Sequence, residues 1–169
     1  MSKTMVKRNL KAYDLLSDIK AVFANIPSDL TQAKVYPAGL NFCEIHLLSR
    51  AIQENYSATD LFRIDSKKDT LSVPTQELDV DYLYSHFVNE YGTGVEIHGP
   101  ADSFFFKLQR DSVFAVLAGS EQLITQAIPF PNDIWNTYFL EIMQGSQSKE
   151  TADIVLEAFN NWSDMPVER

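Results

Sequence analysis

The stretch from Gly94 to Phe130 constrains the fold of this chain more than any other part of the sequence. Its apolar residues alternate or run together, and they do not repeat at helical spacing. Patterns typical of amphipathic helices, with apolar residues at steps of three and four, lie on both sides of it. We therefore expect a β core that flanking helices cover.

The first strand of this core is predicted in the segment GVEIHG. Side chains alternate along a strand, so Val95 and Ile97 face one side of the sheet while Glu96 and His98 face the other. In the next segment, SFFFKLQ, the same alternation directs Phe104, Phe106 and Leu108 toward the core, and Phe105 shares the opposite face with Lys107. Both strands should thus have one apolar face.

The remaining two segments of the core are less alike. Residues 113–118, VFAVLA, are apolar on both faces, which predicts a central strand with neighbours along both edges. Residues 121–130 fit either a return strand or a short helix. We predict a strand, because it would give the central strand its second neighbour.

Helices and a hairpin are predicted outside the core. Asn41 and Glu44 have the spacing of a capping box, which predicts a helix start there. A polar turn at 66–69 joins two short alternating runs, as in a hairpin. The predicted helices are 6–24, 42–56, 80–91, 132–145 and a last one around 155–162. Thr75 or Asp79 is expected to cap the third helix and Gly92 to end it, Asn132 to cap the fourth, and Ser148 to cap the last. A short strand is predicted at 33–36.

These elements predict one α+β domain spanning residues 1–169. Its single antiparallel sheet would have five to six strands, with two helices before it, one inserted after the hairpin and two at the C-terminus. A chain of 169 residues suits one domain, since a second core would leave both halves undersized. We expect residues 1–7 and 163–169 to be loose ends.

Charge and cysteine content limit the kinds of partner and compartment. Lysine and arginine total 14 against 23 aspartates and glutamates, a formal net charge of −9. This balance disfavours binding to nucleic acid, which depends on basic residues, and it suits either solubility or a basic protein partner. Cys43 is the only cysteine, which fits a reducing compartment. With no apolar run long enough to span a membrane and no secretory pattern, we expect a soluble cytoplasmic protein without membrane contact.

Motifs for metals and cofactors are lacking in the sequence. No H-x-x-x-H or paired C-x-x-C occurs, and there is no G-x-G-x-x-G or P-loop, so we predict neither a metal nor a cofactor. His86 and Glu90 are four residues apart on a predicted helix and are expected to form an ordinary solvated pair. Cys43 lies in the first turn of a predicted helix, but its apolar neighbours favour a small buried side chain over a nucleophile.

One group of residues is a candidate site. Glu96 and His98 share a strand face, and Asp102 follows a short turn, so all three are expected to converge at one end of the sheet. A carboxylate beside an imidazole is an arrangement that general acid–base chemistry uses. Tyr91 and Arg110 are expected nearby. The exposed face and turn of an ordinary hairpin would show the same residue types.

Two functional hypotheses from different classes follow. The first is a non-catalytic, acidic protein-interaction or regulatory module, of the inhibitor, immunity-protein or chaperone type, with a basic partner. The second is a small-ligand-binding protein or enzyme with a pocket between the sheet and the 79–91 helix, with Glu96, His98 and Asp102 at its mouth. We favour the first because no catalytic motif is present. The sequence leaves the oligomeric state open.

Overall fold

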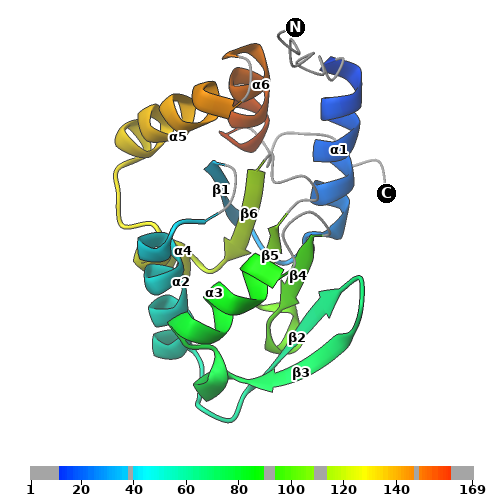
Figure 1. The fold of residues 1–169 in the computed structure, drawn as a ribbon, viewed down its shortest axis with the longest axis vertical. Helices are drawn as coiled ribbons and strands as arrows, with labels where there is room; N and C mark the ends of the chain where they lie inside the picture. Colours follow the sequence, from blue (N-terminus) through cyan, green and yellow to red (C-terminus); the bar gives the residue numbers. More distant parts are fainter. Residues whose placement is uncertain (1–11, 38–39, 90–93, 109–113, 147–148, 161–169) are drawn as a thin grey trace, which may run out of the picture.

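The fold is a six-stranded antiparallel sheet covered by helices (Figure 1). The computed structural model describes residues 12–37, 40–89, 94–108, 114–146 and 149–160. The strands lie in the order β1-β6-β5-β4-β2-β3, and every neighbouring pair is antiparallel. The strands are β1 (Gln32–Pro37), β2 (Leu61–Ser66), β3 (Thr70–Pro74), β4 (Val95–His98), β5 (Phe105–Leu108) and β6 (Phe114–Gly119). The predicted α+β class is confirmed.

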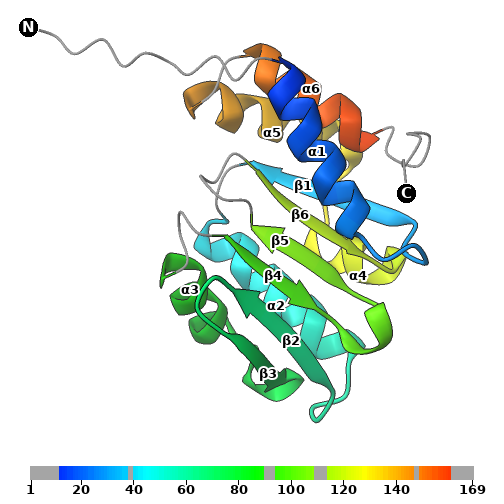
Figure 2. The same cartoon turned by 90° about the vertical axis from the view of Figure 1, so that its right-hand side faces the viewer.

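Helices cover the two faces of this sheet unequally (Figure 2). Three helices pack on one face, over strands from β1 to β3, and three pack on the other, over β1, β6 and β5 only. The first set is α2 (Phe42–Asn55), α3 (Val80–Asn89) and α4 (Glu121–Ala127); the second set is α1 (Ala12–Asn25), α5 (Asn132–Ser146) and α6 (Lys149–Asn160). The start of α5 also contributes Trp135 to the core on the first face. No described helix covers the second face of β4, β2 and β3, so polar side chains can occupy it.

Strand β6 has neighbours along both edges, as its sequence predicts. All of its residues are buried, because both faces carry helices. Its two neighbours are β5 and β1, and the β1 register pairs Val35 with Val116. Trp135, at 5% exposure, belongs to the core beside β1.

The prediction of a strand at 121–130 is wrong, because this segment contains helix α4. Ser120 caps that helix, its side chain accepting a hydrogen bond from the backbone N–H of Leu123 at 3.2 Å. Leu123, Ile124 and Ala127 then fall on one helical face, which is buried against the sheet. Strand β1 pairs with the second edge of β6 instead, so β6 has no free edge with which this segment could pair.

Most local predictions on the described residues are confirmed. Both hydrogen bonds of the capping box at Asn41 and Glu44 are present. The hairpin forms as β2 and β3, and the side chain of Asp79 accepts a hydrogen bond from the N–H of Tyr82 at the start of α3. Cys43 differs from its prediction, since it is exposed. Several predictions fall outside the described residues: the helix start at 6–11, the stop at Gly92, the pair at Glu90, the cap at Ser148, Trp162, and the ends 1–7 and 163–169.

Among the described helices, none combines the length and apolar character needed to cross a lipid bilayer.

Candidate functional sites

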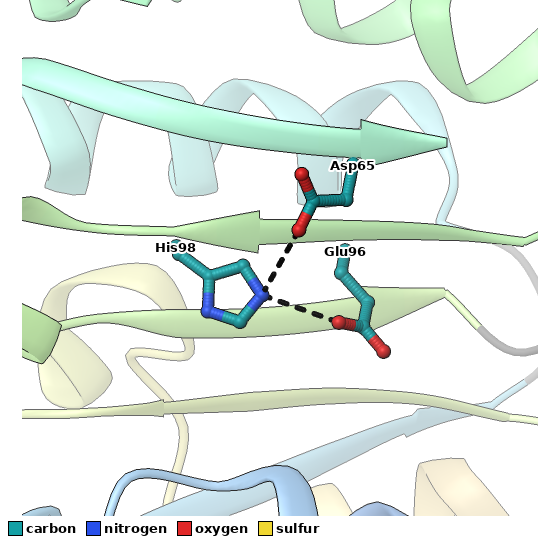
Figure 3. A group of neighbouring side chains, drawn as sticks. All are labelled: Asp65, Glu96 and His98. Carbon is teal, nitrogen blue, oxygen red and sulfur yellow. Dashed lines mark hydrogen bonds and ion pairs between the residues drawn. The ribbon is translucent and has the colours of Figure 1, made fainter. Parts of the chain in front are cut away.

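Charged side chains form a ladder across β2, β4 and β5, on the face of the sheet opposite α2, α3 and α4. The imidazole of His98 lies between two carboxylates, with Nε2 at 3.2 Å from Oε2 of Glu96 and 3.7 Å from Oδ2 of Asp65 (Figure 3). Each carboxylate also meets a cation. The Nζ atom of Lys107 lies 2.9 Å from Oε1 of Glu96, and the Nε atom of Arg63 lies 3.1 Å from Oδ2 of Asp65.

The sheet register explains why these side chains meet. Asp65 is directly opposite Glu96, and Glu96 is directly opposite Lys107, while Arg63 is opposite His98. Cross-strand neighbours on one face lie about 5 Å apart at Cβ, within reach of charged side chains. Partial burial alone would raise the pKa of Glu96. The hydrogen bonds and charges of Lys107 and His98 outweigh that effect and hold the pKa below its usual range.

Three side chains of this ladder lie close enough together to hold one cation, but the charges of the ladder are already balanced. One ligand atom from each of Asp65, Glu96 and His98 lies within 4.8 Å of the others. However, Arg63 and Lys107 already pair with the two carboxylates, and a divalent ion would have to compete with both. The ladder is therefore explained as an ion-pair network, in which the charged side chains on this face of the sheet pair with one another.

The structure brings together only part of the site predicted from sequence. Glu96 and His98 do share a face, but Asp102 lies in the exposed turn η2 (Pro100–Asp102) and is not part of the cluster, whose third member is Asp65. Tyr91 and Arg110 lie outside the described residues.

The alternative pocket was expected between the sheet and the 79–91 helix, with Glu96, His98 and Asp102 at its mouth. Leu83 and Phe87 of α3 pack on the face of β4 that carries Ile97. Glu96 and His98 point from the opposite face, because side chains alternate along a strand. They therefore cannot form the mouth of a pocket between the sheet and α3.

A second candidate site is a pocket of about 290 Å³ between α2 and α5. In Figure 1 the connection between α4 and α5 passes beside α2, and Phe130 of that connection forms part of the pocket wall. Most of the lining is apolar or aromatic. The described lining residues are Asn41, Cys43, Glu44, Leu47, Phe130, Ile134, Trp135 and Tyr138.

Glu44 is the only charged residue among those lining residues. Its Oε1 atom accepts a hydrogen bond from the N–H of Asn41 at 3.2 Å and lies 3.4 Å from the hydroxyl of Tyr138, which donates to it. Its Oε2 atom is buried and accepts no hydrogen bond from any described residue. A buried acceptor without a donor costs about 1–3 kcal/mol, and more when the group is charged. This carboxylate therefore lacks the compensation that the ladder carboxylates have.

The surroundings of Glu44 oppose its ionisation. Burial raises the pKa of this carboxyl, and the hydrogen bonds from Asn41 and Tyr138 only partly offset that effect. The hydroxyl of Tyr36, which is also buried, has no hydrogen-bond partner among the described residues. Burial and the nearby charge of Glu44 both raise the pKa of Tyr36, so the phenol stays protonated. The carboxylate that lines the pocket and the phenol within range of its charge are thus two buried polar groups without full partners.

Exposed apolar side chains continue beyond the pocket. Phe130 and Ile134 are 46% and 55% exposed, although they line it. Ile134, Tyr138 and Ile142 follow one another at four-residue steps along α5, and Ile142 is 43% exposed. On the other side of the α2 start, Phe42 contacts Tyr84 of α3 with ring centroids 5.9 Å apart. We call the pocket together with Phe42, Tyr84 and Ile142 the α2–α5 surface.

Sequence reasoning missed this site because its residues come from distant parts of the chain. Asn41 and Tyr138 are 97 residues apart in sequence, yet the Nδ2–H of Asn41 donates a hydrogen bond to the hydroxyl of Tyr138. One local signal was available for Ile134, which lies outside the apolar stripe formed by Trp135, Phe139 and Met143 on α5.

Comparisons with known proteins add no relative: no protein-family model, no curated protein and no solved structure matches this chain.

Proposed function

We propose that this protein is a non-catalytic interaction module that binds a partner protein through the α2–α5 surface. The observation that carries the proposal is the gathering of half-exposed apolar side chains around a pocket with an uncompensated carboxylate. Single exposed apolar residues are ordinary, but a contiguous group rimmed by polar residues is typical of a docking surface.

The partner is expected to present an apolar segment that carries positive charge. Described residues of the pocket lining include Glu44 and no lysine or arginine. Asp133 and Glu141 are exposed on α5 beside the surface, and the whole chain has a net charge of −9. This charge would steer a basic partner toward the surface and raise its association rate at low salt.

The size of the pocket favours a side chain over a free small ligand. Its volume of about 290 Å³ lies just below the range of roughly 300–1,000 Å³ that small-molecule sites occupy. A module of this kind would act by occupying or restraining its partner, as inhibitors, immunity proteins and dedicated chaperones do. The single cysteine is consistent with action in the cytoplasm, where thiols stay reduced.

Photo-crosslinking from the α2–α5 surface tests this proposal. Cys43 is the only cysteine and is exposed in the pocket, so a benzophenone maleimide attaches there alone. The labelled protein is irradiated in an extract of its source cells, and crosslinked peptides are identified by mass spectrometry. A Cys43→Ser, Ser72→Cys protein carries the same label on the exposed strand β3 and serves as the control.

The expected result is one protein crosslinked from Cys43 and not from residue 72. Ile134→Asp should abolish the crosslink, because it places a charge in the apolar wall. Leu61→Asp should leave it intact, because Leu61 is equally exposed, at 58%, but lies on β2 outside the surface. Equal crosslinking from both positions, or no effect of Ile134→Asp, would reject the proposal.

A further inference from the structure

We infer that the α2–α5 pocket receives one lysine or arginine side chain of the partner, with the cationic end at Glu44. This inference rests on the proposed function and specifies what the partner places in the pocket. The aliphatic part of the side chain would lie against Leu47, Phe130 and Ile134. Long basic side chains commonly bury their methylene groups on apolar surface in this way.

The first argument is the uncompensated carboxylate. Oε2 of Glu44 is buried without a donor, whereas a bound ammonium or guanidinium would supply both the missing hydrogen bond and the missing charge. An apolar side chain in the pocket would leave that oxygen unpaired, and the cost of burying it would remain. The chemistry of the pocket thus selects a cation over a neutral apolar group.

The aromatic walls are the second argument. The rings of Phe130 and Trp135 are stacked with centroids 6.0 Å apart, and the rings of Trp135 and Tyr138 lie 5.2 Å apart. All three line the pocket beside Glu44. Aromatic faces attract cations within about 6 Å of the ring centroid, and tryptophan does so most strongly. Aromatic residues next to a carboxylate therefore suit a cation with an alkyl stem.

A third argument is that none of the described lysines and arginines of this chain lines the pocket. Arg50, on the same helix as Glu44, pairs with Glu54 at 2.8 Å. Lys107 and Arg63 belong to the ladder on the sheet face. The described part of the chain therefore supplies no cation to Glu44.

NMR titration with two matched probes tests the inference. Nitrogen-15-labelled protein is titrated with N-acetyl-lysine methylamide and with N-acetyl-norleucine methylamide, which has the same alkyl chain and no ammonium. Concentrations up to about 50 mM detect dissociation constants in the millimolar range. The backbone amides of Asn41, Cys43 and Leu47 and the indole N–H of Trp135 report on the pocket.

The lysine probe should give saturable shifts at those reporters and bind at least about tenfold more tightly than the norleucine probe, as expected for a desolvated charge pair. Glu44→Gln should remove that preference. This variant keeps the capping box, because glutamine can also accept from the N–H of Asn41. Glu54→Gln is the matched control, because it makes the same change of net charge in an exposed position on the same helix.

Equal binding of the two probes, a lysine preference that survives in Glu44→Gln, or no shifts with either probe would overturn the inference. The proposed function can be judged separately. If Ile134→Asp abolishes the crosslink to the partner while Glu44→Gln leaves it unchanged, the partner uses the surface without a cation in the pocket. If neither change affects the crosslink, the interaction proposal itself fails.

Discussion

The indole N–H of Trp135 donates a hydrogen bond of 2.9 Å to the backbone carbonyl oxygen of Val35. Val35 lies in β1, an edge strand of the sheet, and Trp135 lies in the first turns of α5. The ring of Trp135 also packs edge-on against Tyr36, with centroids 5.7 Å apart. One side chain therefore joins α5 to the sheet edge and forms a wall of the pocket.

Trp135→Phe should destabilise the fold by about 1–3 kcal/mol, because it leaves the carbonyl of Val35 without its donor and removes buried ring area. Urea denaturation measures the change. Tyr138→Phe is a useful comparison, because Tyr138 is less buried and lies on the same helix. Its effect should be smaller. Equal effects of the two substitutions would contradict the anchoring role of Trp135.

Glu44→Gln should stabilise the protein by roughly 1 kcal/mol at neutral pH, because it removes a buried charge that lacks full compensation. The pKa of Glu44 is raised in the fold, so its protonated form favours folding. That contribution is complete below the unfolded pKa, about 4.3, and is lost as the pH rises through the folded pKa.

The advantage of Glu44→Gln over the natural protein should therefore shrink as the pH falls toward the unfolded pKa of Glu44. Urea denaturation at a series of pH values measures it. Glu54→Gln, at an exposed position where the glutamate pairs with Arg50, should change stability much less. A strong loss of stability in Glu44→Gln at neutral pH would show that the carboxylate is compensated in the free protein.

Lys107→Met should destabilise the fold by roughly 1 kcal/mol at neutral pH, because Lys107 pairs with the partly buried Glu96. The pKa of Glu96 is lowered in the fold. Its contribution to stability is therefore present above the unfolded pKa, about 4.3, and is lost as the pH falls through the folded pKa. Denaturation curves of both proteins should converge in acid. A difference that persists unchanged at low pH would contradict this account.

Ala101→Gly should stabilise the protein by about 0.5–1 kcal/mol, because Ala101 has a φ of 51°, a left-handed conformation that glycine adopts without strain. The greater entropy of glycine in the unfolded chain offsets part of the gain. Thermal unfolding measures the result. Ala21→Gly in the exposed part of α1 should instead destabilise, since it is helical. Destabilisation by both substitutions would contradict a strained Ala101.

Local sequence patterns in this chain predicted local structure well, but they predicted poorly which segments, distant in sequence, pair with each other in the sheet. The capping box at Asn41 and the alternation in β4 depend on residues a few positions apart, and both are present. Residues 121–127 were misassigned because their short apolar run fits either period, and the choice depended on which segment pairs with β6. That segment is β1, which is distant in sequence.

The candidate sites show the same limit. Glu96 and His98 were found because they alternate along one strand, whereas Asp65 joins them only through the register between β2 and β4. In the pocket, Glu44 was assigned to a helix cap, and this role is confirmed. Its second oxygen becomes significant only once α5 folds beside α2, and no local pattern encodes that contact.

The most direct test of an open, negatively charged pocket is the rate at which Cys43 reacts with two methanethiosulfonates. One reagent transfers an aminoethyl group and the other an ethyl group, so they differ by a single positive charge. Each rate is divided by the rate with free 2-mercaptoethanol, and mass spectrometry follows the modification. We predict that the relative rate of the aminoethyl reagent is several-fold higher than that of the ethyl reagent, which is about the effect of one nearby negative charge. Glu44→Gln should remove this difference in rate. Equal relative rates in the natural protein, or no reaction at Cys43, would contradict the central claim.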